Sequence, residues 1–331
     1  MTSPASVLIT DFLDDSRLET PILEDLAVIT NVMATHERDL IPHLPEARAF
    51  LLFHDIAMLT DATFALAPKL QVVVRAGVGY NNVDLEAAGA RGIAVCNVPD
   101  YGSEEVADHA IMLMLAVARR LIPQHEDMRR GVWDYKVGLG TPRLRGRVFG
   151  VVGCGRIGTA AALRAKAFGM DVVIYDPNIP PGVEKALGVR REYELAPLLR
   201  QADVVSLHCL LDPTSRGLID ARALELMKPD AILINTARGP VVDQDALISA
   251  LEAGKLTGAG IDVFEREPLD DERLRSHPRV VLTPHSAFYS VEGFEEMRRK
   301  AAEEVRRILE GKKPRNLVNR DRLVAPRIAA W

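Results

Sequence analysis

Short apolar, β-branched runs alternate with longer stretches of mixed polarity along the whole chain. In the first hundred residues the runs are VLIT, AVIT, AFLLF, LQVVV and IAVCNV, which begin at Val7, Ala27, Ala49, Leu70 and Ile93. Runs of this kind between helix-like stretches are typical of βαβ units, whose parallel strands are buried on both faces. This part of the chain is therefore predicted to form a parallel sheet.

A second series of apolar runs follows an amphipathic stretch that we predict to be a helix from Ser103 to about Leu121. The runs are VFGVVG, DVVIYD, DVVSLHC, AILINTA, GAGIDVF and VVLTPH, beginning at Val148, Asp171, Asp203, Ala231, Gly258 and Val280. Six strands make a complete doubly wound dinucleotide-binding sheet. Residues 131–146 are predicted to be an irregular surface segment. A last helix is predicted from Val291 to about Glu310, followed by a tail that returns to the first domain.

Length and composition narrow the class of protein. A chain of 331 residues is longer than one core usually encloses, so two domains are expected. The net charge is -5 and no run of five like charges occurs, which argues against a nucleic-acid partner and against an anionic membrane surface. The most apolar stretch, residues 111–118, is too short to span a bilayer, and the first residues lack a basic signal region. We expect a cytoplasmic location.

The three cysteines, Cys96, Cys154 and Cys209, are far apart in sequence and outside any CxxC spacing. Neither a disulfide framework nor a zinc site is predicted from them, and a reducing compartment fits this pattern. No metal site is predicted elsewhere in the chain.

A glycine motif stands where the first strand of the second series meets a helix. In VVGCGRIG, Gly153, Gly155 and Gly158 form GxGxxG, and the helix-forming stretch AALRAKAF follows. Such glycines allow a tight turn, close approach of the backbone to a pyrophosphate, and helix–strand packing, while the helix N-terminus offers free amides. Arg156 is expected to add a charge-assisted contact. The alternative is a glycine-rich turn that merely joins strand to helix.

An acidic residue ends the next run. Asp176 stands eighteen residues after Gly158 and directly after VVIY. A carboxylate at this point accepts hydrogen bonds from an adenosine ribose and repels a 2′-phosphate. The motif therefore predicts NAD rather than NADP as cofactor.

Several polar residues come just past predicted strand ends, where ligands of doubly wound folds bind. Gly153, Asp176, Cys209, Arg238 and His285 all hold such positions, and Glu267 is placed three residues past Phe264, the last residue of its predicted strand. One sheet edge is thus expected to gather a cation, a carboxylate and an imidazole. Together these groups fit hydride transfer to a 2-oxo acid.

Each of the three has a chemical role in that reaction. Arg238, before a glycine that lets the backbone bend, is expected to grip a substrate carboxylate in bidentate fashion. Histidine is the residue type suited to donating a proton at neutral pH and taking it back in reverse, so His285 is expected to be the proton donor. Glu267 is expected to fix the imidazole tautomer and favour its protonated form. Taken singly, they fit equally well as a surface arginine, a strand-end histidine and a turn residue before Pro268.

Long ordered motifs carry a family resemblance over nearly the whole chain. They are RAGVGYNNVD, CNVPDYGSEEVADHA, LRGRVFGVVGCGRIG, INTARGPVVDQDAL, GAGIDVFEREP and LTPHSAFYS, beginning at Arg75, Cys96, Leu144, Ile234, Gly258 and Leu282. Through them the sequence resembles the D-isomer-specific 2-hydroxyacid dehydrogenases. The resemblance implies an α/β fold of two doubly wound parallel-sheet domains: a Rossmann NAD-binding domain, residues 101–288, and a flavodoxin-like substrate domain, residues 1–100 plus 289–331.

The resemblance also implies the site. Arg238 is the carboxylate anchor, Glu267 and His285 are the acid/base pair, and Asp262 lies near the nicotinamide carboxamide. The cofactor contacts it implies are Gly153, Gly155, Arg156, Ile157, Gly158, Asp176, Pro177, His208, Cys209, Thr214, Thr236, Ala237, Arg238, Asp262 and His285. The substrate contacts are the backbone amides around Val78 and Gly79, with Tyr101, Arg238, His285 and Phe288. The family further implies D stereochemistry, a small 2-oxo or 2-hydroxy acid as substrate, and a homodimer joined largely through the cofactor domains.

Substrate identity is less determined. After His285 the chain reads SAFYS, which is more similar to D-lactate dehydrogenases and C-terminal-binding corepressors than to the HLGA-type residues of phosphoglycerate dehydrogenases. Tyr101 and Phe288 fit equally well as an apolar pocket for the 2-oxo side chain and as hinge packing. One alternative is an NAD(H)-sensing interaction module of the corepressor type, which keeps the same three residues. Another is a dehydrogenase for phosphite. Formate is disfavoured as the substrate, because formate dehydrogenases of similar sequence usually carry Gln at the position of Glu267.

Overall fold

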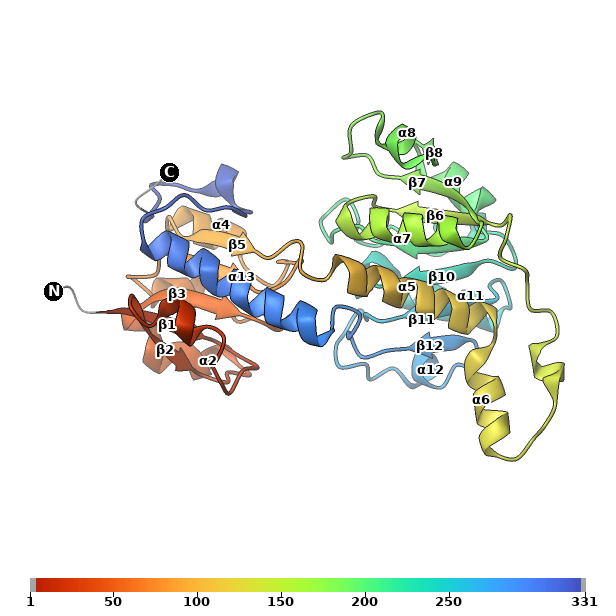
Figure 1. Ribbon diagram of the computed structural model, residues 1–331, viewed down its shortest axis with the longest axis horizontal. Coiled ribbons are helices and arrows are strands. Elements are labelled where there is room, and N and C mark those ends of the chain that lie inside the picture. Colours follow the sequence, from red (N-terminus) through yellow and green to blue (C-terminus); the bar gives the residue numbers. More distant parts are fainter. Residues whose placement is uncertain (1–3, 329–331) are drawn as a thin grey trace. The chain divides into compact units, whose positions relative to one another are not determined.

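The computed structural model describes residues 4–328. The chain divides into two compact units, Met1–Gly102 with Ser290–Trp331 and Ser103–Tyr289. Each unit is an α/β domain around its own parallel sheet (Figure 1). The predicted fold class is therefore confirmed.

The first unit is built on the five predicted strands. They are β1 (Ala5–Ile9), β2 (Ala27–Asn31), β3 (Ala47–Leu52), β4 (Val72–Arg75) and β5 (Ala94–Asn97), in the order β2-β1-β3-β4-β5. All neighbouring strands are parallel, and this order is that of flavodoxin-like sheets.

Helices cover both faces of this sheet. They are α1 (Thr20–Leu23), α2 (Glu37–Leu40), α3 (Asp61–Ala65), α4 (Leu85–Ala90) and α13 (Val291–Leu309), with the 3-10 turns η1 (Ile41–Glu46) and η4 (Arg320–Arg322). Residues of η1, α3 and α4 share one core with β1, β3, β4 and β5. The long helix α13 contacts α1, β3 and β4 and crosses the other face (Figure 1).

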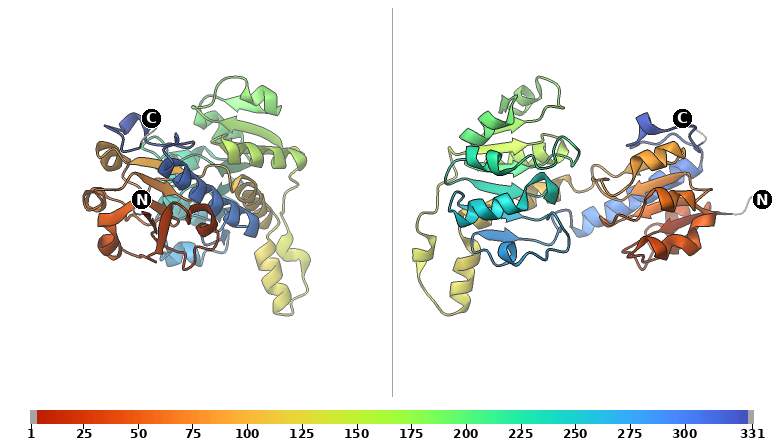
Figure 2. Two further views of the ribbon diagram at one scale, coloured as in Figure 1. Left: turned by 60° about the vertical axis from the view of Figure 1, so that its left-hand side comes forward. Right: turned by 180° about the vertical axis from the view of Figure 1, so that it is seen from behind.

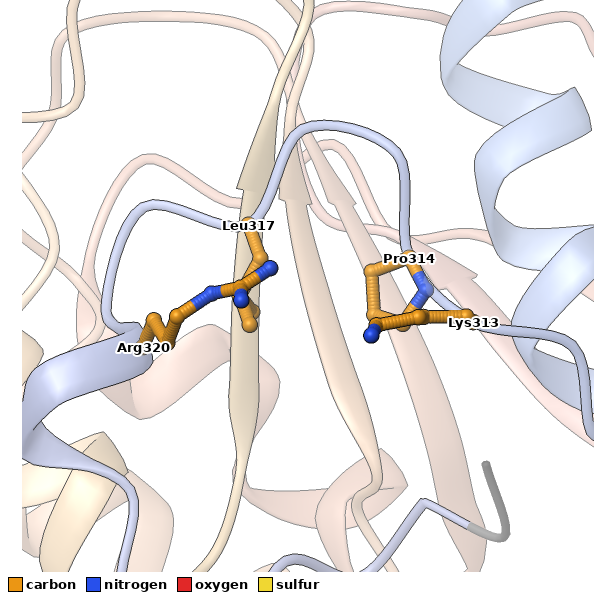
Figure 3. A pocket seen from close by; sticks show the side chains of 4 residues that line it. All are labelled: Lys313, Pro314, Leu317 and Arg320. Atoms are coloured by element: carbon orange, nitrogen blue, oxygen red, sulfur yellow. The ribbon is translucent and has the colours of Figure 1, made fainter. Parts of the chain in front are cut away.

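The segment after α13 packs on the edge strand β5. The N–H of Val318 donates to the carbonyl of Val95 at 2.9 Å, and the buried amide of Asn319 accepts from the N–H of Val95 and donates to the carbonyl of Ile93. The tail therefore returns to the first domain, as predicted. A pocket of about 270 Å³ lies in this segment, lined by Lys313, Pro314, Leu317 and Arg320 (Figure 3).

The second unit has seven strands, so the prediction of six was wrong. They are β6 (Val148–Val152), β7 (Asp171–Tyr175), β8 (Arg190–Glu192), β9 (Val204–Leu207), β10 (Ile232–Asn235), β11 (Gly258–Ile261) and β12 (Val280–Leu282), in the order β12-β11-β10-β9-β6-β7-β8. The missed strand, β8, is the sequence RRE. A short polar edge strand has neither the apolar run nor the alternation by which strands are found.

Helices pack on both faces of the seven-stranded sheet. They are α5 (Ser103–Ala118), α7 (Arg156–Ala167), α8 (Val183–Leu187), α9 (Leu195–Gln201), α10 (Ala221–Leu226), α11 (Gln244–Glu252) and α12 (Glu272–Arg275), with the 3-10 turn η3 (Gly239–Val241). Apolar residues of α5 and α7 form one core with the sheet, and those of α9, α10 and α11 form the other. Parallel strands covered on both faces explain the continuous apolar runs of the sequence.

The predicted helix from Ser103 to about Leu121 is in fact two helices. α5 ends at Ala118, Arg120 takes a left-handed conformation with φ 50°, and α6 (Leu121–Arg129) begins there in a new direction. α6 and the segment after it, with the short turn η2 (Tyr135–Gly138), extend away from the sheet of this unit (Figures 1 and 2). We call residues 121–146 the arm. Across residues 4–328, no helix combines the length and apolar character needed to cross a membrane.

Candidate active site

The glycine turn after β6 owes its shape to close backbone contacts. Gly153 has φ 89°, and a Cβ on it would lie 2.6 Å from the backbone nitrogen of Cys209. A Cβ on Gly158 would lie 2.0 Å from the carbonyl oxygen of Gly153. These two positions accept only glycine: a side chain on Gly153 would collide with the backbone that follows β9, and one on Gly158 would push the helix away from the turn.

Gly155 has a different environment. A Cβ there would meet no described atom within 4 Å, and the residue directly precedes α7, a helix of 12 residues. The first amides of such a helix have no partner within it and carry the positive end of its dipole. An open, glycine-faced helix N-terminus fits the diphosphate of a dinucleotide.

The carboxylate of Asp176 is held beside this turn. Oδ2 accepts the N–H of Cys154 at 2.8 Å, and Oδ1 accepts the N–H of Asn178 at 2.8 Å. Each carboxylate oxygen has a further lone pair, so both can still accept a ribose hydroxyl. The carboxylate of Asp176, which is predicted to bind the ribose, is therefore oriented by a backbone hydrogen bond to each of its two oxygens. The adjoining predicted contacts Arg156 and Pro177 are exposed, and Ile157 is half-buried.

Two buried polar atoms near the same strand ends have no partner among the described residues. They are Nδ1 of His208 and Oγ1 of Thr236. The other ring nitrogen of His208 lies 2.9 Å from Oγ of Ser206. Burial lowers the pKa of His208 to about 4, so its imidazole is neutral at physiological pH. Unsatisfied buried polar atoms are costly, and polar groups of a bound ligand would satisfy these two.

The remaining predicted cofactor contacts at these strand ends differ in exposure. Burial raises the pKa of Cys209 to about 11, so the thiol is uncharged. Ala237 is buried, whereas Thr214 is exposed and tied to Oδ1 of Asp212 through its hydroxyl and its N–H.

The predicted acid/base pair is in direct contact. Nδ1 of His285 lies 2.7 Å from Oε2 of Glu267, and the other carboxylate oxygen accepts the N–H of Phe264 at 3.0 Å. The side chains of His285 and Glu267 are 27% and 33% exposed, so each can be reached by a small molecule. The hydrogen bond fixes both the ring orientation and the position of one ring proton.

The electrostatics of the pair favour an ionised carboxylate. Burial raises the pKa of Glu267, but the hydrogen bond and charge of His285 outweigh this effect, with a smaller contribution from Arg238, so the pKa lies below its ordinary value. Arg238 is thus close enough for its positive charge to lower the pKa of Glu267. A cation, an imidazole and a carboxylate therefore share one site.

Gly239, next to Arg238, has a role other than the expected one. It is not among the glycines with positive φ, so it is not needed for a bend. A Cβ on Gly239 would lie 1.8 Å from the carbonyl carbon of Phe264. The glycine therefore lets the loop with Arg238 lie directly on the loop with Glu267. Asn235 also holds the backbone of Arg238, since its side-chain amide donates to the carbonyl of Arg238 at 3.0 Å.

The chain around His285 is held by Asp262, which is 1% exposed. Oδ1 of Asp262 accepts from the hydroxyl of Thr283 at 2.6 Å and from the N–H of Ser286 at 3.0 Å, and Oδ2 accepts from the N–H of Ala287 at 3.1 Å. His285 itself has φ 51°, a left-handed conformation that non-glycine residues adopt only when their surroundings enforce it.

Two residues of this network, His109 and Thr283, were missed by sequence reasoning. Nε2 of His109, on α5, lies 2.9 Å from Oγ1 of Thr283 and 3.6 Å from Oδ1 of Asp262. Burial lowers the pKa of His109, against the opposing charge of Asp262. His109 lies in the motif SEEVADHA, and its only available signal was a histidine within an apolar helix.

One predicted strand end was misplaced. β11 ends at Ile261 and not at Phe264, so Asp262 is the first residue after the strand and Glu267 comes six residues after its end. Phe288 packs edge-to-face on His285, with ring centroids 6.5 Å apart. The other predicted substrate contacts belong to the first unit, where the carbonyl of Val78 accepts from the amide of Asn97 and Tyr101 is buried.

Comparison with known proteins identifies the family. Residues 111–287 match the family model described as D-isomer specific 2-hydroxyacid dehydrogenase, NAD binding domain. The chain is 42% identical over 269 residues to a glyoxylate reductase of Thermococcus litoralis, covering 78% of this chain and 80% of that protein. It is 37% identical over 313 residues to a D-3-phosphoglycerate dehydrogenase of Methanocaldococcus jannaschii, covering 95% of this chain but 59% of that longer protein.

Among solved structures, the D-lactate dehydrogenase of Aquifex aeolicus complexed with NAD and lactic acid is similar. The TM-score is 0.85 and the sequence identity 29%, with 92% of this chain and 96% of that chain covered. The similarity thus extends over both units and is not limited to the nucleotide-binding half.

Proposed function

Because the chain belongs to the D-isomer-specific 2-hydroxyacid dehydrogenase family, we propose that it interconverts a small 2-oxo acid and the corresponding D-2-hydroxy acid with NAD(H). The observation that carries the proposal is the 2.7 Å contact between Nδ1 of His285 and Oε2 of Glu267, with Arg238 electrostatically coupled to the same carboxylate. An oriented acid/base pair beside a cation matches the needs of carbonyl reduction.

Each residue of the trio has one task. The guanidinium of Arg238 binds the carboxylate of the 2-oxo acid and draws charge toward the carbonyl oxygen. With Nδ1 held by Glu267, Nε2 of His285 donates a proton to that oxygen as it becomes an alkoxide, and it removes the proton in the reverse direction. Glu267 is a positioning residue that keeps the ring oriented and stabilises its charged form.

NAD(H), when bound, supplies or accepts the hydride. The open face at Gly155 and the amides that begin α7 would hold the diphosphate, and the carboxylate of Asp176 would hold the adenosine ribose. The partnerless Oγ1 of Thr236 and Nδ1 of His208 offer further polar contacts. Because a carboxylate repels a 2′-phosphate, we propose NADH as the preferred cofactor.

On the substrate side, we propose that Phe288 lies near the 2-oxo side chain; the contacts expected in the first unit, at Val78, Gly79 and Tyr101, stay a prediction. The edge-to-face packing of Phe288 on His285 supports an apolar surface next to the proton donor. Uncharged side chains on the 2-oxo acid suit an apolar surface better than a phosphate group does. We therefore propose glyoxylate-, pyruvate- or phenylpyruvate-like substrates rather than phosphoglycerate.

A substrate panel tests this function. NADH oxidation at 340 nm is followed with glyoxylate, pyruvate, hydroxypyruvate, phenylpyruvate and a thioether-bearing 2-oxo acid, with the His285→Ala variant as control. We expect turnover of at least one acid that the variant loses. NADH binding without turnover of any acid would favour a sensing module, and NAD reduction by phosphite would favour the other alternative.

We also propose a homodimer in which the arm packs on a second copy. α6 has no buried residue, and Trp133 and Tyr135 are 89% and 79% exposed. Leu121, Met128 and Leu139 of the same segment are exposed too, and apolar side chains exposed together often mark protein–protein contacts. Light scattering of the paired variant Trp133→Ser/Tyr135→Ser tests it: we expect monomers, and a dimer of unchanged mass would refute the role of the arm.

A further inference from the structure

A buried arginine lies under the turn that carries Asp176. Arg191, on β8, has a side chain that is only 6% exposed. Its Nη2 donates to the carbonyl oxygens of Asp176 at 2.8 Å and Ile179 at 3.0 Å, and its Nη1 donates to that of Pro180 at 3.2 Å. Three carbonyls of one short turn therefore converge on a single guanidinium.

The turn is shaped by these contacts. A guanidinium is a rigid planar fork, so carbonyls that bond to it are fixed relative to one another. One of the three belongs to Asp176 itself, whose carboxylate is fixed at its other end by the amides of Cys154 and Asn178. Arg191 thus holds the main chain of the residue whose side chain faces the predicted ribose position.

The same contacts make Arg191 unavailable as a phosphate ligand. An arginine after the second strand of such a domain commonly accommodates the 2′-phosphate of NADP. Here both terminal nitrogens of Arg191 are used by carbonyls, and the guanidinium is covered on one side by Tyr193, whose ring centroid lies 4.8 Å away. Nε is buried as well, so it is not open to a 2′-phosphate.

We propose that Arg191 is a positioning residue of the cofactor site, which sets the preference for NADH by holding Asp176 toward the ribose and which does not itself contact the cofactor. The proposal rests on the proposed function, because it assumes that this unit binds NAD(H). Loss of the guanidinium frees the turn, so Asp176 no longer accepts the ribose hydroxyls in a fixed geometry. NADPH, which gains nothing from Asp176, loses little.

The test compares three variants by fluorescence titration with NADH and with NADPH, without turnover. For Arg191→Met we expect NADH to bind about tenfold more weakly and NADPH to change by less than about threefold, so that the preference narrows. Arg191→Lys keeps the charge but cannot span three carbonyls, so it should resemble Arg191→Met. Arg190→Met is the matched control. It removes the same charge from the neighbouring residue, whose side chain lies on the other face of β8 and whose Nη1 donates to Oε1 of Gln201.

Hydrogen exchange gives a second readout that needs no cofactor. The peptide covering residues 176–182 should exchange faster in both Arg191 variants and at the wild-type rate in Arg190→Met, with melting temperatures recorded to establish that each variant is folded. A larger loss for NADPH than for NADH would make Arg191 a phosphate ligand and overturn the proposal. Unchanged binding of both cofactors would also overturn it. Wild-type protein that binds neither cofactor would instead refute the proposed function.

Discussion

The backbone N–H of His285 donates to the carbonyl oxygen of Asp262 at 2.8 Å, while the carboxylate of the same aspartate accepts the two N–H groups that follow His285 in the chain. One buried residue thus holds the chain on both sides of the proposed proton donor. The left-handed conformation of His285, with φ 51°, is maintained by these bonds. The acid/base pair therefore depends on Asp262 as well as on Glu267.

Replacing Asp262 with Asn is expected to destabilise the protein. An amide nitrogen in place of one carboxylate oxygen faces an N–H donor and leaves it unsatisfied in a buried position. We expect a loss of about 1–3 kcal/mol in the free energy of unfolding, measured by urea denaturation, together with a lower kcat. The exposed Asp245, substituted in the same way, should stay within about 0.5 kcal/mol of wild type. Equal effects of the two substitutions would contradict the role of Asp262.

Loss of Arg238 is expected to affect both binding and chemistry. If the guanidinium binds the carboxylate and polarises the carbonyl, Arg238→Ala raises KM and lowers kcat together. Arg238→Lys should recover little activity, because a point charge does not replace the bidentate fork. Arg266→Ala, at a side chain that is 82% exposed, is the control with the same charge change. Full recovery by Lys would show that charge alone is required.

His285→Ala removes the proposed proton donor. We expect kcat to fall by about 10² to 10⁴, whereas the dissociation constant of NADH, measured by fluorescence, stays close to the wild-type value. The double variant with Glu267→Gln should be little slower than His285→Ala alone, since the two residues act as one unit. Additive losses would mean that Glu267 acts independently of the histidine.

Glu267→Gln by itself is expected to shift the pH dependence. Burial raises the pKa of Glu267, but the hydrogen bond and charge of His285 hold it below its ordinary value, so an ionised carboxylate lies against the imidazole. Without this negative charge the protonated form of the proton donor is less favoured, so we expect the alkaline limb of 2-oxo acid reduction to move toward acid. The measurement is the pH profile of kcat under conditions where chemistry limits the rate. Glu265→Gln, at an exposed neighbour, should leave the limb in place.

Asp176→Ala is expected to narrow the preference for NADH over NADPH. We expect repulsion of the 2′-phosphate and the lost ribose contact together to make kcat/KM with NADPH about a hundredfold lower than with NADH in the wild type. The Ala variant keeps the glycine turn, so both cofactors should still bind. Steady-state kinetics with each cofactor gives the ratio of kcat/KM for NADH to that for NADPH. A wild-type enzyme that uses both cofactors equally would refute the assignment of Asp176.

The sequence was sufficient for the fold class, the family and the position of the nucleotide turn. Continuous apolar runs are what parallel strands covered on both faces require, and the GxGxxG turn is read from residues that are close in the chain. The placement of Arg238 and His285 just past strand ends followed from the same rule, because parallel strands all end at one edge.

Only the tertiary structure decided the contacts between residues far apart in the chain. The strand β8 was invisible to hydrophobic patterning because it is short and polar, so the buried position of Arg191 beneath the turn of Asp176 was unforeseen. The link from His109 to Thr283 joins a helix to a strand end 174 residues away, and no local pattern encodes it. Gly239 is required because the backbone of Phe264 passes over it, not because of its own conformation. Local propensity follows from neighbouring residues, whereas burial, hydrogen-bond partners and close backbone approach are set by the packing of the whole domain.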